Sequence, residues 1–321
     1  MPARKPLAAL AVDLASGRIT SRALVEDGLA RIDDPKGEGA RAFVAVSADA
    51  VRADADAADR ARASGRAPSP FAGIPVAIKD LFDVAGERTR AGSRALDDRP
   101  PAAADAPAVA RLRAAGFIPM GRTNMTEFAY SGLGMNAHFG TPLNPHDRKT
   151  GRIPGGSTSG GAVAVADGMV PAALGTDTGG SCRIPAALCG ITGFKSTAAR
   201  IPREGVIPLS STLDSIGSLA HGVSCCAILD AVLAGGAPEA VQPPPIAGLT
   251  LALPKTYVLD GLDETVARTF ERALKALSAA GAILVEVPFA ELAEIPVLNS
   301  RGGMVNAEAY AWHRPIIERA A

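Results

Sequence analysis

The spacing of apolar and polar residues predicts a surface helix near the start of the chain. Leu24, Val25, Leu29 and Ile32 recur at helical intervals, with charged residues between them. Thr20 precedes this stretch and is a favourable N-cap residue. We therefore expect an amphipathic helix that packs one apolar stripe against the rest of the protein.

Further along, short continuous apolar runs alternate with helical segments. Such alternation is typical of an α/β architecture in which helices cover both faces of a sheet. We also expect a helix to begin near Ile184. The predicted strands are 74–78, 117–120, 170–174, 250–253 and 283–287, and the other predicted helices are 51–63, 105–116, 162–166 and 264–280.

One proline-rich segment, Pro243–Pro245, is a candidate linker. The part that follows it has two predicted strands and one long helix, which are too few elements to bury a core of their own. We therefore expect residues 1–321 to form a single domain, in which this last part extends the same sheet.

Composition narrows the classes of function. The 321 residues are 47% hydrophobic and 21% charged, with 33 basic and 33 acidic side chains and therefore no net charge. This balance does not favour direct binding of nucleic acid, and no apolar run is long enough for a membrane helix. The cysteines form neither a disulfide framework nor a C-x-x-C site, which favours the cytoplasm; they are Cys182, Cys189, Cys225 and Cys226.

Two glycine- and serine-rich loops carry the candidate chemistry, Gly155–Gly161 and Thr176–Ser181. Ser181 follows a predicted strand through Gly179 and Gly180, which allow a sharp turn that aims backbone N–H groups inward. That arrangement suits a serine nucleophile with donors for a developing oxyanion. The alternative is a glycine-rich turn that only caps a helix.

A serine nucleophile needs a base, and none of the four histidines lies in a recognisable hydrolase motif. The G-x-S-x-G nucleophile elbow is missing too. Lys79 ends an apolar strand, where burial would lower its pKa and leave a neutral amine, although such a lysine often reaches out to water instead. Ser157 could relay a proton between Lys79 and Ser181. The alternative, a phosphate-binding loop, has little support because no G-x-x-x-x-G-K-[ST] motif is present.

Charged and thiol side chains flank these groups. Asp177 and Arg183 could pair across the Ser181 loop, or could be two solvated charges. Cys182 is expected to be a small core residue, with a reactive thiol as the alternative. Asp80 could orient Lys79 or cap a turn.

Together these segments resemble the amidase signature family. The motifs are Gly73–Asp80, Gly155–Gly161, and Gly175–Gly190 with Gly193–Lys195, in that order along the chain. The resemblance implies a mixed central sheet with helices on both faces and a Ser-Ser-Lys triad, with no metal or organic cofactor. It implies the following roles: Ser181 as nucleophile, Ser157 as relay, Lys79 as base, and the N–H groups of Thr178, Gly179, Gly180 and Ser181 at the oxyanion. It also implies a cis peptide between Gly156 and Ser157, and it places Ser131 and Ser159 near the substrate pocket. Asp177 and Arg183, which flank the Ser181 loop, are expected to support the same site.

The expected activity is hydrolysis of a small-molecule carboxylic acid amide through an acyl-enzyme, by a homodimer or a single chain. The segment Arg183–Cys189 is most similar to stand-alone bacterial-type amidases. Two alternatives remain, the glutaminase-type subunit of a tRNA-dependent amidotransferase and an inactive truncated homologue. The chain is shorter than is usual for the family, which implies that the C-terminal part of the family fold is missing. It also departs from the family pattern at Thr158, usually Gly or Ser, and at Cys182, usually an aliphatic residue.

Overall fold

The computed structural model describes residues 5–239 and 242–320, which divide into two compact units. The first unit comprises Met1–Val241 and Glu308–Ala321, and the second comprises Gln242–Ala307. The boundary falls beside Pro243–Pro245, the segment that the sequence indicated as a linker. Within the described residues, no helix is both long enough and apolar enough to cross a membrane.

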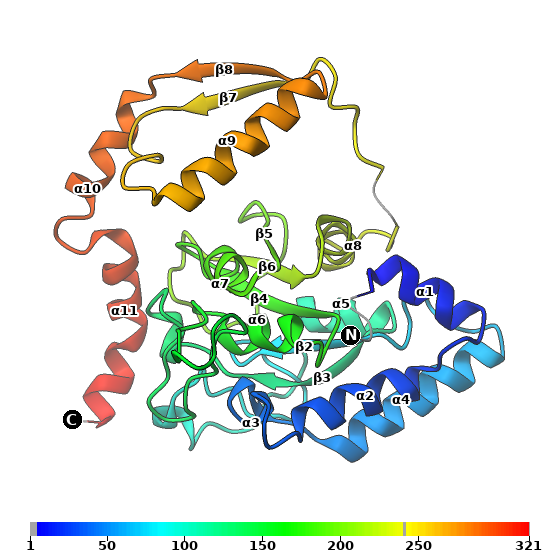
Figure 1. Ribbon diagram of the computed structural model, residues 1–321. Helices are drawn as coiled ribbons and strands as arrows, with labels where there is room; N and C mark the ends of the chain where they lie inside the picture. Colours follow the sequence, from blue (N-terminus) through cyan, green and yellow to red (C-terminus); the bar gives the residue numbers. More distant parts are fainter. Residues whose placement is uncertain (1–4, 240–241, 321) are drawn as a thin grey trace. The chain divides into compact units, whose positions relative to one another are not determined.

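The first unit is built on a six-stranded mixed sheet, as the resemblance implied (Figure 1). Its strand order is β1-β3-β2-β4-β6-β5, with β2 parallel to both β3 and β4, and with the pairs β1–β3, β4–β6 and β5–β6 antiparallel. The strands are β1 (Phe43–Ala45), β2 (Pro75–Lys79), β3 (Ile118–Thr123), β4 (Ala172–Asp177), β5 (Thr192–Lys195) and β6 (Ser215–Ala220).

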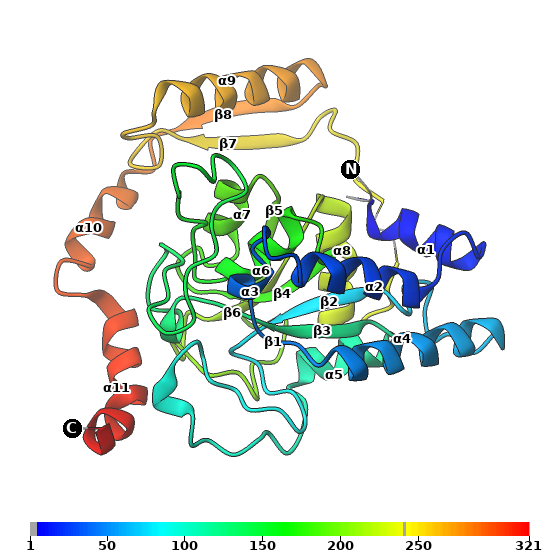
Figure 2. The same ribbon diagram turned by 60° about the horizontal axis from the view of Figure 1, so that its bottom comes forward.

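Helices cover both faces of this sheet (Figure 2). On one face α6 contacts β2 and β4, and its small residues form a core cluster with Ala77, Ala173 and Leu219 from three neighbouring strands. On the other face α5 contacts β3, and α8 contacts β5 and β6. The helices of this unit are α1 (Leu7–Ala15), α2 (Ser21–Ile32), α3 (Gly39–Ala42), α4 (Ala48–Ala63), α5 (Pro107–Ala114), α6 (Ser159–Ala166), α7 (Arg183–Cys189), α8 (Val223–Leu233) and, from Glu308 on, α11 (Gly303–Ala320), with short 3-10 turns η1 (Arg94–Leu96) and η2 (Glu127–Ala129).

The second unit consists of a parallel strand pair and the helix between them. In sequence order it contains β7 (Thr250–Pro254), α9 (Glu264–Ala279), β8 (Ile283–Val287), the 3-10 turn η3 (Ala290–Glu294) and α10 (Ile295–Leu298). Of these elements, β7, α9 and β8 match the predicted positions, but β7 and β8 form a sheet of their own and pair with no described strand of the larger sheet. The expectation that they extend it was therefore wrong, because the two strands pair in parallel with each other instead.

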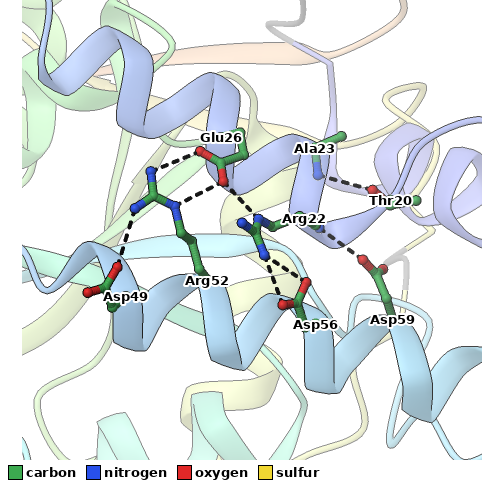
Figure 3. A network of polar contacts seen from close by, with 8 residues as sticks. All are labelled: Thr20, Arg22, Ala23, Glu26, Asp49, Arg52, Asp56 and Asp59. Carbon is green, nitrogen blue, oxygen red and sulfur yellow. Dashed lines mark hydrogen bonds and ion pairs between the residues drawn. The ribbon is translucent and has the colours of Figure 1, made fainter.

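The amphipathic helix predicted behind Thr20 is α2, and the Thr20 hydroxyl accepts a hydrogen bond from the N–H of Ala23 at 3.0 Å. Ion pairs join α2 to α4, as Figure 3 shows. Arg52 contacts Glu26 at 2.9 Å, and Arg22 contacts Asp56 at 2.8 Å. These side chains are about 35–42% exposed, so solvent screens their attraction.

A different ion pair lies inside the first unit. Asp80 and Arg122 are 1% and 3% exposed, and the Arg122 Nε donates to the Asp80 carboxylate at 3.0 Å. Burial raises the pKa of Asp80 above its ordinary range despite this partner, so desolvation outweighs the attraction. No hydrogen bond joins Asp80 to Lys79; the carboxylate binds Arg122 and the N–H of Gly92 instead.

Removing one partner from the buried pair should be far more damaging than removing one from the exposed network. We expect Asp80→Ala to lower the free energy of unfolding by about 3–5 kcal/mol, because it removes the buried counter-charge of the Arg122 guanidinium and leaves only the more exposed Glu87 carboxylate, 3.8 Å away. Glu26→Ala is the control, with a much smaller loss. Urea unfolding of both variants measures this, and equal losses would contradict it.

Candidate active site

Lys79 ends β2 inside the protein rather than at its surface. Its side chain is fully buried, and Nζ lies 2.8 Å from Ser157 Oγ and 2.8 Å from Thr176 Oγ1. Burial lowers the pKa of Lys79 from 10.5 to about 8, although the negative charges of Asp214 and Asp177 oppose this shift. The lysine therefore does not reach out to water, and the burial expected of a candidate base is present.

Ser157 is placed by close contacts between backbone segments. It is fully buried, and the peptide between Gly156 and Ser157 is cis, as the resemblance implied. The N–H of Gly156 donates to the carbonyl of Gly132 at 2.8 Å, and the Ser157 carbonyl accepts from the N–H of Thr126 at 3.1 Å. A Cβ on Gly156 would lie 2.5 Å from the backbone nitrogen of Gly134, so only glycine fits there.

Ser181 lies in the turn between β4 and α7, and the carboxylate of Asp177 organises that turn. Asp177 accepts from the N–H of Gly180 at 2.8 Å and from the N–H of Cys182 at 3.1 Å. The predicted pair with Arg183 is present, with nitrogen–oxygen distances of 3.0 and 2.9 Å. Burial alone would raise the pKa of Asp177, but these hydrogen bonds outweigh it and hold the pKa below its ordinary value.

The four N–H groups expected at the oxyanion are not equivalent. That of Gly180 is already directed at Asp177. Among the described residues, the N–H groups of Thr178, Gly179 and Ser181 have no protein acceptor. A Cβ on Gly179 would meet nothing within 4 Å, so the turn is open at that point.

The two serines assigned a supporting role, Ser131 and Ser159, form no hydrogen bond with Lys79. Ser131 Oγ accepts from the N–H of Leu133 at 3.0 Å within its own loop. Ser159 begins α6 and is fully buried, and its hydroxyl has no hydrogen-bond partner in the described part of the chain. Neither contacts Lys79, Ser157 or Ser181 through a hydrogen bond, and their roles stay predictions.

All four cysteines are buried free thiols. Burial raises the pKa of Cys182 to about 12, so the thiolate is negligible at neutral pH. Cys182 is therefore a core residue, and the reactive alternative has no support. Among the described residues, no three His, Cys, Asp or Glu side chains gather where they could hold a metal ion.

Sequence reasoning missed two residues that hold this site together. Thr176 is the second partner of Lys79, and Asp214, just before β6, accepts from the hydroxyl of Thr178 and from the N–H groups of Leu209 and Ser210. Thr176 stands within the Ser181 motif, but the orientation of its hydroxyl is not readable from sequence. A cavity of about 310 Å³ is lined by Thr176, Arg203 and Asp214, among others, which leaves room for a small molecule next to Thr176.

Comparisons with known proteins agree on one family. The family model described as Amidase matches residues 23–313. A glutamyl-tRNA(Gln) amidotransferase subunit from Chromohalobacter salexigens is 43% identical over 88% of this chain and 60% of its own length. A 1-carboxybiuret hydrolase subunit from a Pseudomonas species is 44% identical over 72% of this chain and 49% of its own. The chain thus spans roughly half to three fifths of these two curated relatives.

Solved structures of amidases also match this chain. A structure described as that of an amidase superposes with a TM-score of 0.88 at 34% identity, covering 98% of this chain and 70% of that one. The native peptide amidase from Stenotrophomonas maltophilia has a TM-score of 0.79 at 30% identity, covering 98% of this chain and 68% of that one. The mixed sheet covered by helices is therefore the fold of these enzymes.

The lowered pKa of Lys79 has a consequence for stability. Between about pH 8 and pH 10.5 the unfolded chain holds a proton on Lys79 that the folded chain has lost, so raising the pH through this window stabilises the wild type. Lys79→Met removes that contribution. Relative to the variant, we expect the wild type to gain up to about 3 kcal/mol in free energy of unfolding over this window. Urea unfolding of both proteins at several pH values measures the difference, and a pH-independent difference would contradict the buried amine.

Proposed function

This chain belongs to the amidase family, and from that membership we propose that it hydrolyses a carboxylic acid amide to the acid and ammonia or an amine. The observation that carries the proposal is the contact of 2.8 Å between Lys79 Nζ and Ser157 Oγ in a fully buried setting. With a pKa of about 8, about a tenth of the Lys79 amines would be neutral at pH 7. For an ordinary lysine the neutral fraction would be about 300 times smaller.

In the proposed reaction, the Ser181 hydroxyl attacks the amide carbonyl carbon. Its proton passes to Ser157 while the Ser157 proton passes to the neutral Lys79 amine, and the carbonyl oxygen becomes an oxyanion. The C–N bond then breaks as the proton returns through Ser157 to the leaving nitrogen. Water attacks the resulting ester by the same proton path, which releases the acid and restores Ser181.

The oxyanion would be held by backbone N–H groups of the Ser181 turn. We assign this role to Thr178, Gly179 and Ser181, whose N–H groups have no acceptor among the described residues. Gly180 contributes differently, since its N–H binds Asp177 and keeps the turn in shape. Preorganised donors of this kind contribute strongly to stabilising the transition state of acyl transfer, because they need not reorient as charge develops.

Removing the nucleophile tests the proposal directly. We expect Ser181→Ala to lower kcat for simple amides by about 10⁴-fold or more, because no other group forms the acyl-enzyme. Ser69→Ala is the matched control, since Ser69 and Ser181 are both 7% exposed and the Ser69 hydroxyl bonds only to backbone groups, the carbonyl of Ala115 and the N–H of Phe71. Wild-type activity in Ser181→Ala would end the proposal. If the folded wild type fails to react with a serine-directed phosphonate, the alternative that this chain is an inactive truncated homologue is favoured.

A second candidate function is that of an amidotransferase component. It is favoured by the name of the relative that is 43% identical to this chain, and it implies an assembly with other chains. In that case we expect glutamine hydrolysis to be slow in the isolated chain and to rise at least tenfold when partner proteins and tRNA are added. Fast hydrolysis of simple amides by the chain alone, with no response to partners, would exclude it. A homodimer and a cytoplasmic location stay proposals, the latter supported by the four free thiols.

A further inference from the structure

The residues that follow the two serines converge on one backbone oxygen. Thr158 follows Ser157 and Cys182 follows Ser181, and both side chains are fully buried. Cys182 Sγ lies 3.4 Å from the carbonyl oxygen of Thr176, and Thr158 Oγ1 lies 3.5 Å from the same atom. The Thr176 side chain in turn accepts from Lys79. One residue of β4, Thr176, is therefore in contact with both serine loops and with the lysine.

The two side chains also share one confined space on the sheet. Gly175 of β4 stands opposite Gly217 of β6, and the absence of side chains there leaves a hollow. A Cβ on Gly175 would lie 2.9 Å from the Thr158 methyl carbon and 3.1 Å from Cys182 Sγ, and one on Gly217 would lie 3.1 Å from Cys182 Sγ. The Thr158 and Cys182 side chains thus fill the hollow. A larger side chain at position 158 or 182 cannot be accommodated without moving a neighbouring residue.

A backbone hydrogen bond transmits such a movement to the serines. The N–H of Thr158 donates to the Ser181 carbonyl at 3.2 Å, while the Thr158 hydroxyl and the Cys182 thiol both donate to the Thr176 carbonyl. If either side chain shifts, one serine loop shifts relative to the other. Thr158 and Cys182 are also the two positions at which the sequence departs from the family pattern, and in the structure they contact the same carbonyl oxygen and line the same hollow.

We propose that Thr158 and Cys182 act together as positioning residues that set the distance between Ser157 and Ser181. The inference rests on the proposed roles of those two serines. Proton transfer between two hydroxyls requires an oxygen–oxygen separation of about 2.6–3.2 Å, and a misplacement of about 1 Å can slow a reaction 100-fold. The volume shared by the pair therefore controls the rate of the chemical step and not the binding of substrate.

Complementary changes in volume test the pair. Cys182→Val adds roughly one methyl group to the hollow, whereas Thr158→Ser removes one methyl and keeps the hydroxyl. We expect Cys182→Val to lower kcat for a simple amide about tenfold with KM unchanged, and Thr158→Ser to lower kcat about threefold. The double variant should return to within about threefold of wild type, because the lost methyl makes room for the added one. The labelling rate of Ser181 by a fluorophosphonate should follow kcat.

Cys225→Val is the matched control. Cys225 is also buried, at 2% exposure, but it lies in α8, where its sulfur accepts from the N–H of Leu7. This variant should lower Tm and leave kcat unchanged, alone and in combination with Thr158→Ser. If Cys182→Val fails to fold, Cys182→Ala replaces it, and a kcat at the wild-type level in that variant overturns the inference.

The outcomes separate this inference from the proposed function. If the effects of the two substitutions on kcat simply multiply, or if KM changes rather than kcat, the joint positioning role of Thr158 and Cys182 is overturned. The amidase proposal still stands in that case, provided that the wild type is active and labelled at Ser181. A folded wild type with neither activity nor label at Ser181 would overturn both, because the serines would then have no reaction to position.

Discussion

The burial of one amine governs the arrangement of this protein. Lys79 can act as a base only if water and full counter-charges are kept away from Nζ. Its two hydrogen-bond partners are hydroxyls, which hold the amine without stabilising the ammonium as a carboxylate would. The two carboxylates whose charges act on Lys79, Asp177 and Asp214, form their hydrogen bonds with other groups. Asp177 is bound by Arg183 and by N–H groups of its own turn, and Asp214 is bound by Thr178 and by backbone donors.

Glycines make this burial geometrically feasible. At Gly160 a Cβ would lie 2.2 Å from the carbonyl oxygen of Ala42, so only glycine lets α6 begin this close to its neighbour. The loop that holds Ser157 can therefore pack closely against the end of β2, where Lys79 lies. The facing pair Gly175 and Gly217 gives room for the residues behind the serines in the same way. The glycines of the motifs thus meet a packing requirement, and at Gly155 and Gly180 they also adopt the positive φ values that other residues disfavour.

Sequence patterns predicted the elements whose apolar residues are regularly spaced. The helix behind Thr20 and the strand at 283–287 are confirmed, as is the pairing of Asp177 with Arg183. The strands β5 and β6 were missed because Gly193, Gly217 and the serines of β6 dilute the apolar signal, although every residue of β6 is buried. Those small residues are needed where backbone and sulfur atoms approach the sheet, and packing against distant residues leaves no local pattern.

The same reason explains the missed parts of the site. Thr176 and Asp214 matter because of what they touch, namely an amine 97 residues away along the chain and a hydroxyl 36 residues away. A motif can identify a hydroxyl or a carboxylate, but it cannot identify the partner of either. The separate sheet of β7 and β8 was missed for a similar reason, since strand pairing is decided in three dimensions.

The distance along the chain between Lys79 and Ser157 also has a consequence for how the protein is made. These residues are 78 positions apart, and they meet only when the loop before α6 packs against the end of β2. Until then the lysine is in water, keeps its proton and cannot activate a serine. Under the proposed mechanism, a nascent or partly folded chain is therefore inactive until the loop that carries Ser157 has packed against the end of β2.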